Sequence, residues 1–143
     1  MLKIVSLMLA VAGLLAAGEG EGRGCSLESL KGNWGFVVNG TRPSGPPPAA
    51  LEQMIGVVRR HFDGLGNLTG TENIHGSISG LVPDRLVTGT YSINEDCSGT
   101  MNLTAPGITP LEMRFVLVDK GKEIRAAVMS PATVMVTANG RRL

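Results

Sequence analysis

Eight short runs rich in β-branched residues, each closed by glycine, proline, asparagine or aspartate, are the feature that most constrains how this chain folds. Alternation is clearest in Trp34, Phe36 and Val38, where every second side chain faces one side of a sheet. Helical periodicity is confined to a single turn over 26–30, which Ser26 is placed to cap. The pattern predicts eight strands, over residues 33–39, 54–62, 68–74, 86–93, 100–104, 111–118, 123–129 and 133–138.

The connections between these runs are typical of hairpins, because 63–67, 94–99 and 119–122 carry residues that tolerate positive φ. Sequential strands should therefore pair as antiparallel neighbours. An open meander would expose its edges, whereas closure removes them. We therefore predict an all-β fold, a single up-and-down antiparallel β-barrel of about eight strands. Only 42–50, with four prolines, is a longer connector, expected to cross one end of the barrel as a spacer.

The first 18 residues have the pattern of a secretory signal. Lys3 supplies a positive start, residues 4–15 are apolar, and small residues follow at Ala16 to Gly18. The apolar segment is shorter than the roughly 20 residues of a membrane-spanning helix, so we expect cleavage and no transmembrane segment in the mature chain. The predicted organisation is a signal peptide (1–18), a linker (19–24) and a β-barrel domain (25–143), exported to the periplasm or the extracellular medium.

The chain holds two cysteines, Cys25 and Cys97. An even number in an exported protein predicts one disulfide, which would close a loop of about 72 residues and stabilise the fold by about 4 kcal/mol. The alternatives are a two-thiol metal site or a reactive thiol. Neither cysteine has a histidine or second cysteine at ligand spacing, which favours the disulfide.

Charge and chemistry-bearing residues exclude several functions. The chain has 13 basic and 12 acidic residues, and loss of Lys3 with the signal leaves a neutral chain, so we expect no binding to nucleic acid. His61 and His75 fall on consecutive strands but not opposite one another, so we expect no metal site. No Gly-x-Ser-x-Gly elbow is present, and no cofactor motif is found. These observations favour a protein that is not an enzyme.

A short basic run precedes the first predicted hairpin turn. Arg59 and Arg60 are adjacent on a strand and must point to opposite faces, so at most one of them enters the barrel. The run is interpreted mainly as a solvated surface, with an anion-binding group at the barrel mouth as the alternative.

A longer series of residues extends over most of the chain after the expected signal. It comprises Cys25, Leu27, Leu30, Gly32, Trp34 and Phe36, then Phe62-Asp63-Gly64 with Gly66-Asn67, Gly89-Thr90-Tyr91, Cys97-Ser98-Gly99-Thr100, Phe115 to Asp119 and Glu123-Ile124. This series resembles a group of small exported bacterial proteins that are similar to calycins and to allene-oxide-cyclase-like barrels.

Within that series, Gly32-Asn33-Trp34 resembles the Gly-x-Trp of the first lipocalin strand. The resemblance implies that Trp34 closes one end of the barrel and that Arg141 or Arg142 packs on it. It also implies binding of a small apolar ligand, whereas the similarity to allene oxide cyclases implies the fold alone.

Three hypotheses follow for the function. The first is a non-catalytic barrel that binds a small apolar ligand, lined by Trp34, Phe36, Tyr91, Met113 and Phe115. The second is a structural or surface-interaction protein that self-associates or contacts the cell envelope. The third is an isomerase or cyclase, which requires a deep pocket holding a histidine or glutamate with a perturbed pKa. Whether the barrel is hollow or filled is open at this point, since glycines on the strands fit a cavity or tight coiling equally.

Overall fold

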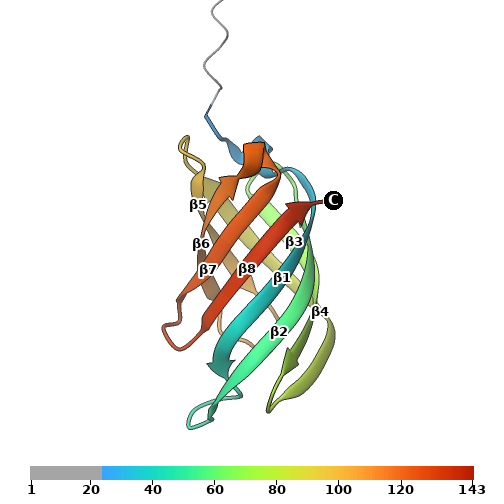
Figure 1. The fold of residues 1–143 in the computed structure, drawn as a ribbon, viewed down its shortest axis with the longest axis vertical. Helices are drawn as coiled ribbons and strands as arrows, with labels where there is room; N and C mark the ends of the chain where they lie inside the picture. Colours follow the sequence, from blue (N-terminus) through green and yellow to red (C-terminus); the bar gives the residue numbers. More distant parts are fainter. Residues whose placement is uncertain (1–23) are drawn as a thin grey trace, which may run out of the picture.

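The computed structural model describes residues 24–143; the expected signal peptide and residues 19–23 of the expected linker lie outside the described residues. Eight antiparallel strands pair in chain order, and β1 pairs with β8 to close a barrel (Figure 1). The predicted fold class is confirmed. The strands are β1 (Gly32–Pro43), β2 (Leu51–Phe62), β3 (Asn67–Gly76), β4 (Gly80–Ile93), β5 (Ser98–Thr104), β6 (Leu111–Val118), β7 (Glu123–Ser130) and β8 (Met135–Arg142).

The two ends of the barrel are built differently. One end carries the short 3-10 helix η1 (Leu27–Leu30), the turns 63–66 and 94–97, and η2 (Asp119–Gly121). We call this the capped end; it lies at the top of Figure 1, beside the C-terminus. The other, which we call the open end, carries the loops 44–50, 77–79, 105–110 and 131–134. The predicted helical turn is confirmed as η1, with Ser26 at its N-cap.

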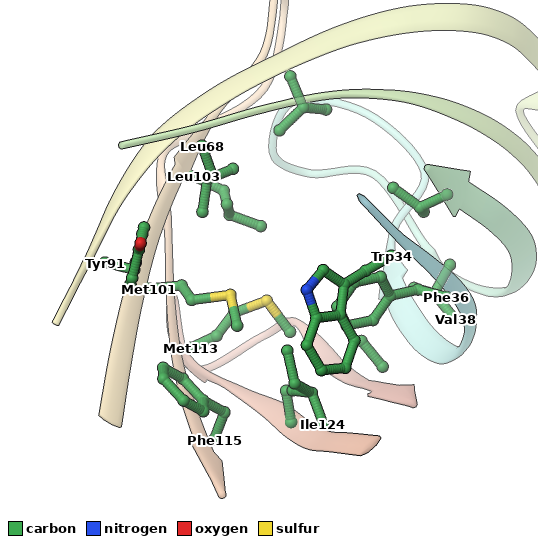
Figure 2. Close-up of a cluster of buried hydrophobic side chains, with 14 of the residues drawn as sticks. Trp34, Phe36, Val38, Leu68, Tyr91, Met101, Leu103, Met113, Phe115 and Ile124 are labelled. Atoms are coloured by element: carbon green, nitrogen blue, oxygen red, sulfur yellow. The ribbon is translucent and has the colours of Figure 1, made fainter. Parts of the chain in front are cut away.

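Alternation along the strands divides inside from outside. In β1, Trp34, Phe36 and Val38 are buried, and in β6 the same holds for Met113 and Phe115. Met101 and Met113 are register partners that both point into the barrel (Figure 2). The side chains that alternation placed on one face of the sheet are therefore the ones that point into the barrel. A strand in a closed barrel has one face toward the interior and one toward solvent, which is why every second residue is buried.

Strand β4 begins at Gly80, six residues before the start that the sequence predicted. Pro83 and Asp84 are residue types that disfavour a strand, and proline removes a donor from the ladder, so the sequence did not indicate this extension. In the structure Asp84 has a positive φ of 48°. Both residues sit in a bulge, where they stand opposite the single residue Asn73, whose side-chain oxygen accepts a hydrogen bond from the Asp84 N–H (3.2 Å). The bulge shifts the register by one residue, so that Arg85 pairs with Glu72.

Strand β8 runs to Arg142, four residues beyond its predicted end. Asn139 and Gly140 are of the residue types that close the predicted runs, but Gly140 lies directly opposite Phe36 in the ladder. A Cβ on residue 140 would stand 2.5 Å from the Phe36 ring, so only glycine leaves room for the ring to lie over the strand. Gly99 receives the ring of Phe115 in the same way. Strand glycines next to the aromatic rings therefore serve close packing.

Candidate functional site

The barrel interior is filled at the capped end. Trp34 and Phe62 are fully buried there, and their rings pack edge to face with centroids 6.3 Å apart. Phe62 packs in the same manner on Tyr91 at 5.1 Å. The tips of both polar aromatics are satisfied by η1: Trp34 Nε1 donates to the carbonyl of Leu30 (2.8 Å), and Tyr91 Oη donates to that of Leu27 (3.0 Å). Aromatic packing and hydrogen bonds together hold η1 over this end.

Arg142 fastens the capped end from outside. Its guanidinium lies 4.5 Å from the centroid of the Trp34 ring, so the contact that the lipocalin resemblance implied is present. It also donates hydrogen bonds to the carbonyls of Ser29 (2.7 Å), Lys31 and, in η2, Gly121 (3.2 Å). Arg142 thereby links β8 to η1, to the residue that follows η1, and to η2.

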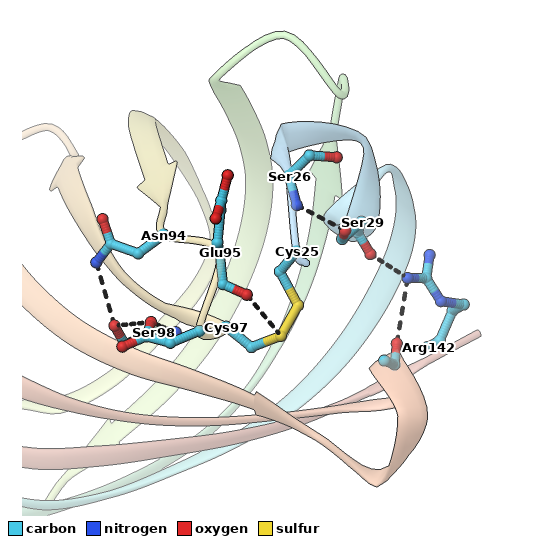
Figure 3. The surroundings of a disulfide bond; sticks show 10 residues. Cys25, Ser26, Ser29, Asn94, Glu95, Cys97, Ser98 and Arg142 are labelled. Carbon is cyan, nitrogen blue, oxygen red and sulfur yellow. Dashed lines mark hydrogen bonds between the residues drawn. A yellow bond between two sulfur atoms is a disulfide. The ribbon is translucent and has the colours of Figure 1, made fainter. Parts of the chain in front are cut away.

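The predicted disulfide between Cys25 and Cys97 is confirmed (Figure 3). It joins the segment before η1 to the turn between β4 and β5, across 72 positions of sequence. The backbone N–H of Cys25 donates to the carbonyl of Glu95 (3.1 Å) beside it. Trp34, Arg142 and the disulfide thus all lie at the capped end, around η1.

A cavity of about 780 Å³ occupies the open half of the barrel. This volume falls within the range of small-molecule sites, about 300–1,000 Å³. The proline-rich loop 44–50, expected to cross one end, contributes to the wall at the mouth together with residues 107–109 and 131–134. The apolar lining from the strands comprises Val38, Pro43, Leu51, Met54, Ile74, Val82, Val87, Leu103, Leu111, Met113, Val128 and Val136.

The five residues expected to line a ligand site all lie inside the barrel, where each is at most 5% exposed. Met113 lines the cavity. The other four, Trp34, Phe36, Tyr91 and Phe115, are not among its lining residues and belong to the packed core of the capped half. The large aromatic side chains fill the capped half of the barrel, so the cavity begins where the inward residues become aliphatic. The same alternation, followed toward the open end of the strands through Val38, Met54 and Val87, would have identified residues that line the cavity.

At the mouth of the cavity, Glu52 is held by a cluster of donors. Its carboxylate accepts hydrogen bonds from the Arg42 guanidinium (2.9 Å), the Ser79 hydroxyl (2.7 Å) and the backbone N–H groups of Ser79 (2.8 Å) and Ile78 (3.0 Å). Burial alone would raise the pKa of Glu52, but these donors together lower it to about 2. Glu52 therefore stays ionised and ties β2 to the β3–β4 turn.

We predict that Glu52→Gln destabilises the protein at pH 7 by about 2 kcal/mol, because a charged acceptor loses its charge while its donors remain. The carboxyl has a lower pKa folded than unfolded, so its contribution is complete above about pH 4.5 and is lost as the pH falls toward 2. Urea unfolding at a series of pH values measures this. The free energy of unfolding of Glu52→Gln should depend less on pH in that window than that of the native protein. The control Glu112→Gln, at an exposed ion pair, should show the same pH dependence as the native protein. Equal pH dependence in Glu52→Gln would contradict the prediction.

Deeper in the cavity, three charged side chains face inward. Glu72 accepts a hydrogen bond from Arg85 Nε (2.7 Å) across the β3–β4 ladder, and both residues line the cavity. Arg60, from β2, also lines it and is only 2% exposed, whereas its neighbour Arg59 points to solvent. Sequence reasoning placed at most one of this pair inside, and the structure shows that it is Arg60. Burial lowers the pKa of Arg60 to about 10, with the charge of Glu72 acting in the opposite direction, so Arg60 is cationic at neutral pH.

Both histidines lie on the outer surface. His61 pairs with Thr69 and His75 with Ile55, so they are not opposite one another, as expected. Neither lines the cavity. In residues 24–143 no group of three or more histidine, cysteine, aspartate or glutamate side chains is arranged to hold a metal ion.

Two further findings complete the description. In the part of the chain that the structure covers, no helix has the length and apolar character needed to cross a membrane. In comparisons with known proteins, no family model matches this sequence and no curated protein matches it significantly.

Proposed function

We propose that this chain is an exported, non-catalytic binding protein that takes up a small, mostly apolar molecule in the open half of its barrel. The observation that carries the proposal is the cavity of about 780 Å³, which has a predominantly aliphatic wall and a mouth built from loops. The disulfide supports export, since such bonds persist outside the cytoplasm. The closed barrel and the packing of Arg142 on Trp34 support assignment to the calycin-like proteins.

The arrangement of the protein suits binding by a rigid container. The capped half is densely packed and cross-linked, so the walls of the open half are held by a preformed core. A ligand entering such a site buries apolar surface without first ordering the protein. The carboxylates near the cavity, Glu52 and Glu72, are each engaged by an arginine, an arrangement that favours structural roles over proton transfer.

A neutral fluorescent lipophile, N-phenyl-1-naphthylamine, tests the proposal. We expect its emission to rise on mixing with the native protein, and the melting temperature to rise with its concentration, by an amount equivalent to about 2.7 kcal/mol at a hundredfold excess over Kd. No emission change and no thermal shift, with this probe or with other uncharged lipophiles, would contradict the proposal.

Filling the cavity should abolish this binding. Val87 is 3% exposed and lines the cavity, so Val87→Phe places a ring in the space a ligand would use. We expect the affinity for the probe to fall at least about tenfold, since the lost contact area and the steric overlap both act against the ligand. The matched control is Val57→Phe, on the outer face of β2, which should bind as the native protein does. Unchanged binding by Val87→Phe would place the probe elsewhere.

One observation favours self-association as a second candidate function. Val37 and Val57 are direct partners on the outer face of β1 and β2, Ile55 lies beside them, and all three are more than half exposed. Every strand of the barrel has two neighbours, so a second copy would have to pack on this face rather than add to a strand edge. Light scattering over a range of protein concentrations tests it: a dimer without ligand supports this candidate, and a constant monomer mass contradicts it.

A further inference from the structure

In the part of the chain that the structure covers, the guanidinium of Arg60 is buried and has no carboxylate or carbonyl as hydrogen-bond partner. Within residues 24–143, the hydrogen bond recorded for it runs from Nη1 to the sulfur of Met101 (3.9 Å), and its Nε has no partner. It lies over the ring of Phe36, with Cζ 4.6 Å from the centroid. A guanidinium has five N–H donors, and leaving them unpaired in an apolar interior is costly.

The other charges around the cavity are already matched. Arg42 is paired with Glu52, and Arg85 with Glu72. Glu72 acts on Arg60 only through its electrostatic field, because its close ion pair is with Arg85. The cavity therefore holds one positive charge in excess, and that charge belongs to Arg60.

Arg60 stands at the inner limit of the cavity. Its register partner in β1 is Trp34, and the next inward residue along β2 is Phe62; both belong to the packed core of the capped half and neither lines the cavity. From Arg60 toward the mouth, the wall is mainly aliphatic, through Val38, Val87 and Val136, and the charged residues Glu72 and Arg85 on it are paired with each other. A ligand that pairs with Arg60 must therefore extend its remaining body along an apolar wall toward the open end.

From this geometry we propose that the natural ligand is an amphiphilic carboxylic acid, bound with its carboxylate on the guanidinium of Arg60 and its apolar body directed toward the open end. A carboxylate matches the planar fork of arginine and carries the single negative charge that balances it. A phosphate monoester would bring about 1.5 to 2 negative charges and leave the cavity net negative. The inference rests on the proposed function, since it assumes that the cavity takes up a ligand.

Calorimetric titration with dodecanoate below its critical micelle concentration and with 1-dodecanol below its solubility limit tests the inference in the native protein. The two probes share an apolar chain and differ in the charge of the head group. We expect dodecanoate to bind at least about 30-fold more tightly, as is typical of a desolvated charge pair. Equal affinity for both probes would overturn the inference while leaving the proposed function standing. Failure of both to bind, together with failure of the uncharged lipophiles, would overturn the two together.

Two variants assign the preference to this residue. Arg60→Met keeps an unbranched apolar stem but removes the charged guanidinium, so it should bind 1-dodecanol and lose the preference for the acid. It should also unfold at a higher temperature than the native apo protein, because an unpaired buried charge is removed. Arg59→Met, on the outer face, should retain the native preference. A preference for dodecanoate that survives in Arg60→Met would overturn the inference, as would its loss in Arg59→Met.

Discussion

Trp34→Ala is expected to lower the free energy of unfolding by about 4 kcal/mol, one of the two largest effects we predict for a change in this chain. Trp34 is fully buried, so the substitution removes its apolar contacts and leaves a void in the capped half. It also removes the hydrogen bond to Leu30, the edge-to-face packing on Phe62 and the contact with Arg142. For a domain of this size the corresponding drop in melting temperature is about 15 °C.

Urea unfolding of Trp34→Ala and Trp34→Phe separates the contributions. Phenylalanine keeps a ring in the core but donates no hydrogen bond to Leu30, so its cost should be about half that of alanine. Arg142→Met should also destabilise the fold, since Arg142 stacks on the indole and binds three backbone carbonyls, whereas Arg141→Met should have little effect at its exposed ion pairs. A loss below about 1 kcal/mol in Trp34→Ala would contradict the packing described for the capped end.

Removing the disulfide, as Cys25→Ala with Cys97→Ala, is expected to cost about 4 kcal/mol. The bond closes a loop of 72 positions that contains β1 to β4, and without it the unfolded chain gains the corresponding conformational freedom. The same loss should appear when the native protein is unfolded in the presence of dithiothreitol. Chemical denaturation with and without the reductant measures both.

The disulfide also provides a test of how the two halves of the barrel divide their roles. It lies at the capped end and the cavity lies in the open half, so the double variant should bind N-phenyl-1-naphthylamine with native affinity at a temperature where it remains folded. A reductant that left the stability of the native protein unchanged would contradict the structural role. Loss of probe binding in a folded variant would contradict the separation between cap and cavity.

The overall fold could be predicted from the sequence because local signals agreed with the global arrangement. Alternation through Trp34, Phe36 and Val38 set the inward face of β1, and glycine-rich and aspartate-rich turns required antiparallel neighbours. The cysteine count predicted the one disulfide, and the resemblance to lipocalins implied that Arg141 or Arg142 packs on Trp34, of which the structure shows Arg142. Each of these depends on short-range chemistry or on a motif of a few residues.

The candidate site could be predicted only in part, because a cavity depends on the summed volume of inward residues from all eight strands. Large aromatics suggested a ligand surface, but in the folded chain they fill the capped half. The inward direction of Arg60 depends on the phase of β2, and the alternation rule alone left Arg59 and Arg60 equivalent. The charge pair of Glu72 and Arg85 depends on a bulge that Pro83 and Asp84 concealed.

Anomalous diffraction from crystals soaked with ω-bromododecanoic acid tests most directly whether the open half of the barrel is a binding site. The structure predicts a bromine peak inside the barrel, on the open side of Val87, with the acid group in density beside Arg60. Bromine found only on the outer face, or a barrel interior in which side chains occupy the whole space, would contradict it.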